Sequence, residues 1–122
     1  MNSVLIMLGS NLYPEKNLEL AKRKLALLFQ IETSSQLLVT EPVGVHYRSP
    51  FTNIAFRVVS SFSQSETRLL LKQIEVEMGR TDASKQTGLI PIDIDLIFWN
   101  QELVHRDYER FPFVRNCIDQ IR

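Results

Sequence analysis

Apolar residues along this 122-residue chain recur at two spacings, which alternate in a definite order. Four stretches have the continuous or alternating apolar positions typical of strands: 4–8, 33–40, 53–60 and 90–99. Between them, 14–29 and 64–78 repeat apolar residues every three or four positions, as one face of a helix does. The pattern therefore predicts the order β-α-β-β-α-β.

Signals at the ends of the two predicted helices support this order. Pro14 suits the first turn of a helix. Ser63 and Glu66 have the spacing of a capping box, and Gly79 is a natural residue just past a helix end. With right-handed crossovers, the order predicts a ferredoxin-like α+β sandwich in which two helices cover one face of an antiparallel sheet. We expect one domain over 1–122.

Two aspartates interrupt the last predicted strand. Alternation puts four apolar side chains on its core face: Ile92, Ile94, Leu96 and Phe98. Asp93 and Asp95 then share the opposite face with Ile97 and Trp99. The two carboxylates repel unless a cation lies beside them, and Mg²⁺ takes such oxygen ligands. The residues alone leave two interpretations open, a metal site and the solvated face of an edge strand.

Composition narrows the class of protein. The chain is 44% hydrophobic and 23% charged, with 14 acidic and 14 basic residues, which argues against a general nucleic-acid or anionic-membrane surface. Cys117 is the only cysteine, so no intramolecular disulfide is possible. No apolar run is long enough to span a bilayer, and the N-terminus lacks a basic region typical of signal peptides. We expect a cytoplasmic protein with no obligate protein partner.

Two predicted loops carry candidate binding residues. Two prolines and a glycine make 41–50 a loop, where Tyr47 and Phe51 could stack on a flat ligand. The polar stretch 81–89 is also predicted as a loop, and Arg80 just before it suits an anion. Gly9 ends the first strand, either as an ordinary turn or as backbone beside a ligand.

Five short segments together carry a family resemblance: Leu-Gly-Ser-Asn-Leu at 8–12, Thr-Glu-Pro-Val-Gly at 40–44, Phe-Thr-Asn at 51–53, Ile-Glu and Gly-Arg at 74–75 and 79–80, and Ile-Asp-Ile-Asp at 92–95. In this order and spacing they resemble the 6-hydroxymethyl-7,8-dihydropterin pyrophosphokinase family over about residues 3–104. The resemblance implies a transferase of folate biosynthesis, 2-amino-4-hydroxy-6-hydroxymethyldihydropteridine diphosphokinase. Such an enzyme transfers pyrophosphate from ATP to a reduced pterin and releases AMP.

The resemblance also implies roles for individual residues. Asp93 and Asp95 would hold two Mg²⁺ ions that bridge the ATP phosphates. The pterin site would comprise Thr40, Pro42, Val43, Gly44, Phe51 and Asn53. The nucleotide site would comprise Glu75, Arg80 and Leu96. Arg80 and Lys85 would act in catalysis by stabilising charge on the transferring group.

Some positions depart from the family pattern. Ile90 stands where the family has an arginine, and Phe113 follows Pro112 where the family has a nucleotide-contacting histidine. The 81–89 loop has one cation, Lys85. We also expect this domain to lack the family's C-terminal extension. Four residues could supply the lost positive charge: Lys85, Arg106, Arg110 and Arg115. The alternatives to a divergent kinase are a non-catalytic pterin- or nucleotide-binding paralogue and an interaction domain without a small ligand.

Overall fold

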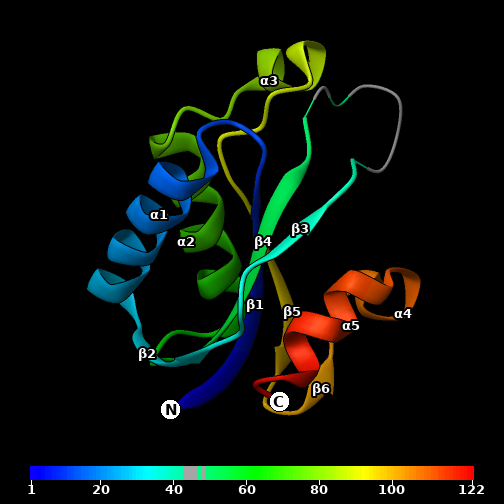
Figure 1. The fold of residues 1–122 in the computed structure, drawn as a ribbon. Coiled ribbons are helices and arrows are strands. Elements are labelled where there is room, and N and C mark those ends of the chain that lie inside the picture. The colour runs from blue at the N-terminus through cyan, green and yellow to red at the C-terminus, as the bar shows by residue number, and fades with distance from the viewer. Residues whose placement is uncertain (43–46, 48) are drawn as a thin grey trace.

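The computed structural model describes residues 1–42, 47 and 49–122. Within these residues, six strands form one antiparallel sheet in the order β2-β4-β1-β5-β6, and β3 also pairs with β4 (Figure 1). The strands are β1 (Asn2–Ser10), β2 (Gln30–Ser34), β3 (Leu38–Thr40), β4 (Phe51–Ser60), β5 (Asp93–Trp99) and β6 (Glu102–Leu103). The central strand β1 is flanked by β4 and β5, and its end pairs with the start of β5, where Gly9 lies opposite Asp93.

Helices cover both faces of the sheet. Helices α1 (Pro14–Leu28) and α2 (Gln64–Glu77) lie on one face, over a core that includes Ile6, Leu25 and Ile74. On the other face lie α4 (Asp107–Arg110) and α5 (Pro112–Asp119), and a second cluster fills the space under α5. The short helix α3 (Asp82–Thr87) lies beyond the end of α2 (Figure 1).

The predicted βαββαβ order and its ferredoxin-like α+β fold are confirmed. Helix α1 begins at Pro14, and both hydrogen bonds of the capping box between Ser63 and Glu66 are present at the start of α2. Gly79 follows α2 with a φ of 94°, a backbone conformation that favours glycine. The local signals at the helix ends thus fixed the helix boundaries to within one residue.

The predicted strand 33–40 is two strands in the structure. Both β2 and β3 pair with β4, and Ser35 lies between them. The buried Ser35 donates its backbone N–H to the carbonyl of Ala55, but its side-chain Oγ accepts the N–H of Ala55 at 2.9 Å. A side chain therefore replaces the backbone acceptor at this position, and the regular ladder is interrupted.

The predicted faces of Phe98 and Trp99 are wrong because β5 contains a β-bulge. Ile6 pairs with Leu96 and Leu5 pairs with Phe98, which leaves Ile97 as the extra residue. Ile97 and Phe98 consequently both point toward the cluster under α5, whereas Trp99 packs against the core under α1 and α2. The aspartates precede the bulge and keep their predicted face.

Two helical regions were not predicted. Residues 82–87 form α3 instead of a loop, and the Oγ of Ser84 accepts the backbone N–H of Thr81 at its start. The C-terminal stretch, which carried no prediction, forms α5, with Val114, Cys117 and Ile118 buried against the sheet. Burial raises the pKa of the Cys117 thiol, as expected for a core residue. Among the described residues, no helix has the length and apolar character that a membrane span requires.

Candidate functional site

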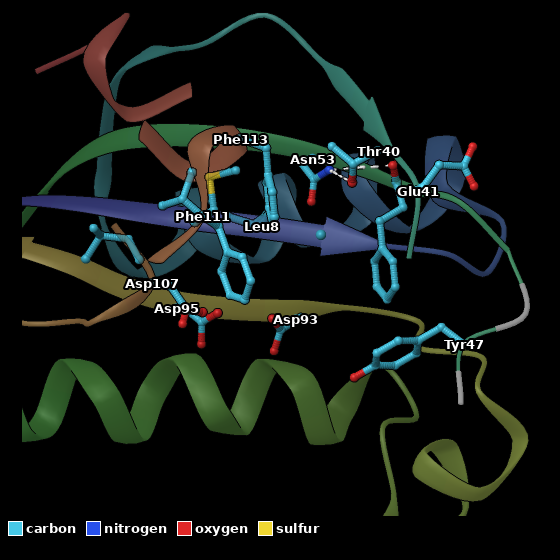
Figure 2. Close-up of a pocket in the computed structure, with 15 residues that line it drawn as sticks. Leu8, Thr40, Glu41, Tyr47, Asn53, Asp93, Asp95, Asp107, Phe111 and Phe113 are labelled. Carbon is cyan, nitrogen blue, oxygen red and sulfur yellow. Dashed lines mark hydrogen bonds between the residues drawn. The ribbon is translucent and has the colours of Figure 1, made fainter. Parts of the chain in front are cut away.

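A cavity of 220 Å³ opens on the sheet face that carries α5. Figure 2 shows Asp93 and Asp95 pointing into it from β5, Asn53 from β4, Phe111 from the residue before α5, and Phe113 from the first turn of α5. Side chains that are far apart in the sequence meet here because β4 and β5 flank β1 in the sheet. The cavity therefore combines carboxylates on β5 with an amide on β4 and aromatic side chains.

The two aspartates have different surroundings. Asp93 is half-buried, and its Oδ1 accepts a hydrogen bond of 2.6 Å from Nη1 of Arg80. Burial raises the pKa of the Asp95 carboxyl, His105 opposes this rise, and the negative charge of Asp93 adds to it. Asp95 thus carries its charge in a place where a further cation would stabilise it.

A buried glutamate joins helix α2 to the acidic strand. Glu75 is 4% exposed, and its Oε2 accepts the backbone N–H of Ile94 at 2.7 Å and Nη1 of Arg80 at 3.2 Å. Its Oε1 lies 3.3 Å from Nζ of Lys72. Positive and negative side chains therefore alternate in one connected row across the site, in the order Lys72, Glu75, Arg80 and Asp93. Glu75 is held in place in this row by its burial and its hydrogen bond to β5.

A histidine lies beside Asp95, although sequence reasoning expected the site to lack one. His105 Nε2 is 3.7 Å from Asp95 Oδ1, and the carboxylate raises the pKa of the imidazole above its ordinary value. His105 Nδ1 accepts the backbone N–H of Asp107 at 3.1 Å. One ligand atom from each of Asp95, His105 and Asp107 lies within 4.8 Å of the others. In the sequence, His105 and Asp107 are two residues apart and follow the last strand closely. This spacing is the one signal from which they could have been predicted as site residues.

The β4 side of the cavity is built around Asn53, which is 4% exposed. Its Nδ2 donates to the Thr40 Oγ1 at 2.9 Å and to the Leu38 carbonyl at 3.0 Å, and so ties β3 to β4. A Cβ on Gly9 would lie 3.0 Å from Asn53 Oδ1, so the close approach of these residues needs glycine. Gly9 is thus backbone that lines the cavity.

Several predicted binding residues have clear positions. Thr40, Phe51 and Asn53 line the cavity, as does Tyr47, whose ring packs edge-to-face on Phe51 with centroids 5.1 Å apart. Pro42 is not among the residues that line it, whereas Glu41 is. Val43 and Gly44 lie outside the described residues.

A second cavity of 170 Å³ adjoins the first on the side of helix α2. Its lining comprises Arg68, Leu71, Lys72, Ile94, Asp95, Leu96 and His105. Leu96, predicted to contact a nucleotide, is part of this lining, whereas Glu75 and Arg80 line neither described cavity. Asp95 lines both cavities and so stands at their junction.

The cations expected to replace the lost family arginine lie elsewhere. In the described part of the chain, Lys85, Arg106, Arg110 and Arg115 do not line these two cavities. Lys85 is exposed on α3, Arg110 stacks over Phe111 at 4.9 Å, and Arg115 donates to the carbonyl of Glu109. Ile90, at the family's arginine position, is 1% exposed and belongs to the interior. The second cavity instead has Arg68 and Lys72, which sequence reasoning did not single out.

Comparison with known proteins identifies relatives of the whole chain. A model of the 7,8-dihydro-6-hydroxymethylpterin-pyrophosphokinase family matches residues 5–122. The chain is 34% identical over 116 residues to a folate synthesis bifunctional protein of Arabidopsis thaliana, covering 92% of this chain and 24% of the relative. It is 29% identical over 119 residues to the 2-amino-4-hydroxy-6-hydroxymethyldihydropteridine pyrophosphokinase of Bacillus subtilis, covering 93% of this chain and 70% of the relative. The chain therefore spans about a quarter of the bifunctional plant protein and most of the bacterial one.

Proposed function

Because the chain belongs to the 7,8-dihydro-6-hydroxymethylpterin-pyrophosphokinase family, we propose that it transfers pyrophosphate from ATP to 6-hydroxymethyl-7,8-dihydropterin and releases AMP. The observation that supports this best is the position of Asp95, which lines two adjacent cavities. Two substrates that must react with each other need neighbouring sites with the reacting groups at the junction. An acidic junction also suits phosphate chemistry, because the phosphates can reach carboxylates through cations.

The residues at the junction fit Mg²⁺. Asp93 and Asp95 offer hard oxygen ligands, and burial, together with the negative charge of Asp93, raises the pKa of Asp95, so a bound cation would stabilise its charged form. We propose that these two aspartates hold the two ions of the family. When bound, Mg²⁺ would offset the charge of the phosphates and polarise the phosphoryl oxygens.

We assign the pterin to the first cavity and ATP to the second. Phe51, Tyr47 and Phe113 provide aromatic surface for a flat ring, and Asn53 provides an amide at its edge. Pro42, Val43 and Gly44 remain part of the proposed pterin site through the family pattern. In the second cavity, Leu71 and Leu96 offer apolar contacts for a base, and Arg68 and Lys72 offer positive charge for phosphates.

In the proposed reaction, the pterin hydroxymethyl oxygen attacks the β-phosphorus of ATP. A bond forms between that oxygen and the β-phosphorus, the bond from the β-phosphorus to the bridging α–β oxygen breaks, and AMP leaves with that oxygen. The hydroxyl proton is released. Arg80 lines neither cavity but contacts Asp93, so it would stabilise charge on phosphates that bind at the two aspartates, and Glu75 orients Arg80 from the buried side. Lys85 would reach the phosphates only through a movement of α3.

One observation favours a second candidate, a non-catalytic pterin- or nucleotide-binding paralogue. The family's arginine position is the buried Ile90, so no positive charge can enter the site from there. Incubation of the protein with ATP, the pterin and Mg²⁺ separates the two candidates. We expect AMP and pterin pyrophosphate in equal amounts. Calorimetric binding of the pterin without AMP release would instead support the paralogue.

A prediction follows for Arg68 and Lys72, the cations of the second cavity. Replacing either by methionine should raise the KM for ATP about tenfold and leave the KM for the pterin unchanged, because each lines only the nucleotide cavity. Steady-state kinetics with each substrate varied in turn measures both constants. Lys16→Met, an exposed cation on α1, is the matched control. An unchanged KM for ATP in both variants, with a raised value in Lys85→Met, would assign the role to α3.

A further inference from the structure

We propose that Arg80 serves as an internal counter-cation for Asp93, which a divalent ion must displace, and that Glu75 retains the displaced guanidinium. This inference rests on the proposed function, because it assumes that Asp93 binds metal. It assigns Arg80 a role before the reaction, in addition to its contact with phosphates. The location of the Arg80 guanidinium then depends on whether a metal ion is bound.

The ion pair of Arg80 and Asp93 has the properties of an exchangeable contact. Its N–O distance is 2.6 Å, and the two side chains are 24% and 38% exposed. Charge-assisted hydrogen bonds of this length are strong, so the pair holds Asp93 in one orientation. Since Asp93 is partly exposed and faces the first cavity, a hydrated ion has access to the same carboxylate. Guanidinium and metal therefore compete for one ligand.

Arg80 has a second carboxylate that an incoming ion would not take. Glu75 lies 3.2 Å from Arg80 Nη1 and is buried against β5, where the N–H of Ile94 fixes it. The carbonyl of Ile92 accepts a further hydrogen bond of 3.3 Å from the same Nη1. After losing Asp93, the guanidinium would stay beside the site with hydrogen-bonding capacity to spare. Phosphate oxygens are the acceptors that suit it.

The exchange makes metal binding weaker than the two aspartates alone would allow, because each ion must first break the Arg80 contact. The exchange also couples metal binding to phosphate binding. Phosphate oxygens that accept hydrogen bonds from Arg80 draw its guanidinium away from Asp93, which leaves the carboxylate free for the metal ion. Arg80 thereby neutralises the charge of Asp93 until the metal ion and the phosphates have both bound. Removing the guanidinium should accordingly strengthen metal binding even as it weakens catalysis.

Binding of Mn²⁺ to the protein without nucleotide tests this inference. Free Mn²⁺ is measured by electron paramagnetic resonance in titrations of the wild type, Arg80→Met and Asp93→Asn. We expect Arg80→Met to bind Mn²⁺ about two- to fivefold more tightly than the wild type, the upper part of the range for a partly exposed ion pair. Arg23→Met removes the same charge from an exposed pair with Glu19 and should leave the affinity unchanged.

A second measurement titrates the wild-type protein, so its result does not depend on whether a variant folds correctly. The Nε–Hε signal of Arg80, assigned by its absence in Arg80→Met, is followed by NMR during a Mg²⁺ titration. We expect it to shift in proportion to metal saturation. Suppose that Asp93→Asn loses Mn²⁺ binding, as expected. The inference is then overturned if Arg80→Met binds Mn²⁺ no more tightly than the wild type, or if the Arg80 signal does not shift when Mg²⁺ is added. Wild-type affinity in Asp93→Asn would instead overturn the metal assignment in the proposed function, and the inference with it.

Discussion

Asp95→Asn is expected to lower kcat for pterin-dependent AMP release by about three powers of ten or more. The amide is nearly the same size as the carboxylate, so the two cavities that meet at Asp95 should keep their shape. What the substitution removes is the negative charge at their junction. Without that charge the proposed metal site loses one of its two carboxylates, and the phosphates lose the cations that would neutralise them.

The same substitution should stabilise the folded protein at neutral and alkaline pH. Burial and the nearby Asp93 raise the pKa of Asp95 in the folded state above the unfolded value of about 3.9. A group with a raised folded-state pKa binds its proton more tightly when folded, so its ionisation costs folding free energy. That cost is fully present above the folded-state pKa and disappears as the pH falls below about 4. Loss of activity with a gain of stability is the pattern of a charge retained for function.

Two measurements check this prediction. Chromatographic assay of AMP gives kcat, and thermal unfolding between about pH 4 and pH 8 gives the stability difference. Asp119→Asn, the same change at an exposed position of α5, should alter neither, because the amide oxygen can still accept the hydrogen bond from the Tyr108 hydroxyl. If Asp95→Asn retains turnover within tenfold of the wild type, Asp95 is not a ligand of the essential metal.

The fold was predictable wherever local sequence determines local structure. The leucine stripe of α1, the capping box at Ser63 and the glycine at 79 act within a few residues, and each has its predicted place. The bulge at Ile97 was not predictable, because alternation along one strand carries no information about the register of its partner. The interruption at Ser35 depends in the same way on a hydrogen bond to β4, twenty residues further along the chain.

The site divides along the same line. Asp93 and Asp95 were identified from two adjacent alternate positions on one strand, and the structure brings both into the cavity. His105, Arg68 and Lys72 join the site only through the packing of α2 and the segment after β6 beside β5. No periodicity marks such residues, because each is an ordinary polar residue on its own element. Glu75 is a different case, because the family resemblance placed it in the nucleotide site, whereas the fold buries it against β5, where it accepts the N–H of Ile94.

Asn53→Leu is expected to lower kcat/KM for the pterin about a hundredfold and to leave the KM for ATP unchanged. The hydrogen bonds of Asn53 to described residues all use Nδ2, which leaves Oδ1 directed toward Gly9 and the cavity. An acceptor in that position matches the amino and ring N–H donors at the edge of a pterin. Leucine fills the space but offers no acceptor, so those donors would be desolvated without a partner.

A second variant separates recognition by Oδ1 from the structural role of Nδ2. Both Asn53→Leu and Asn53→Asp lose the donor that ties Thr40 and Leu38 to β4, so both should lower the unfolding temperature. Only the aspartate keeps an oxygen toward the cavity, so it should retain more pterin affinity than leucine. Pterin affinity follows from fluorescence titration, with Asn116→Leu on the exposed face of α5 as the control. Equal losses in both variants would mean that Asn53 acts by holding β3 in place, and that the pterin contacts lie in the strand it anchors.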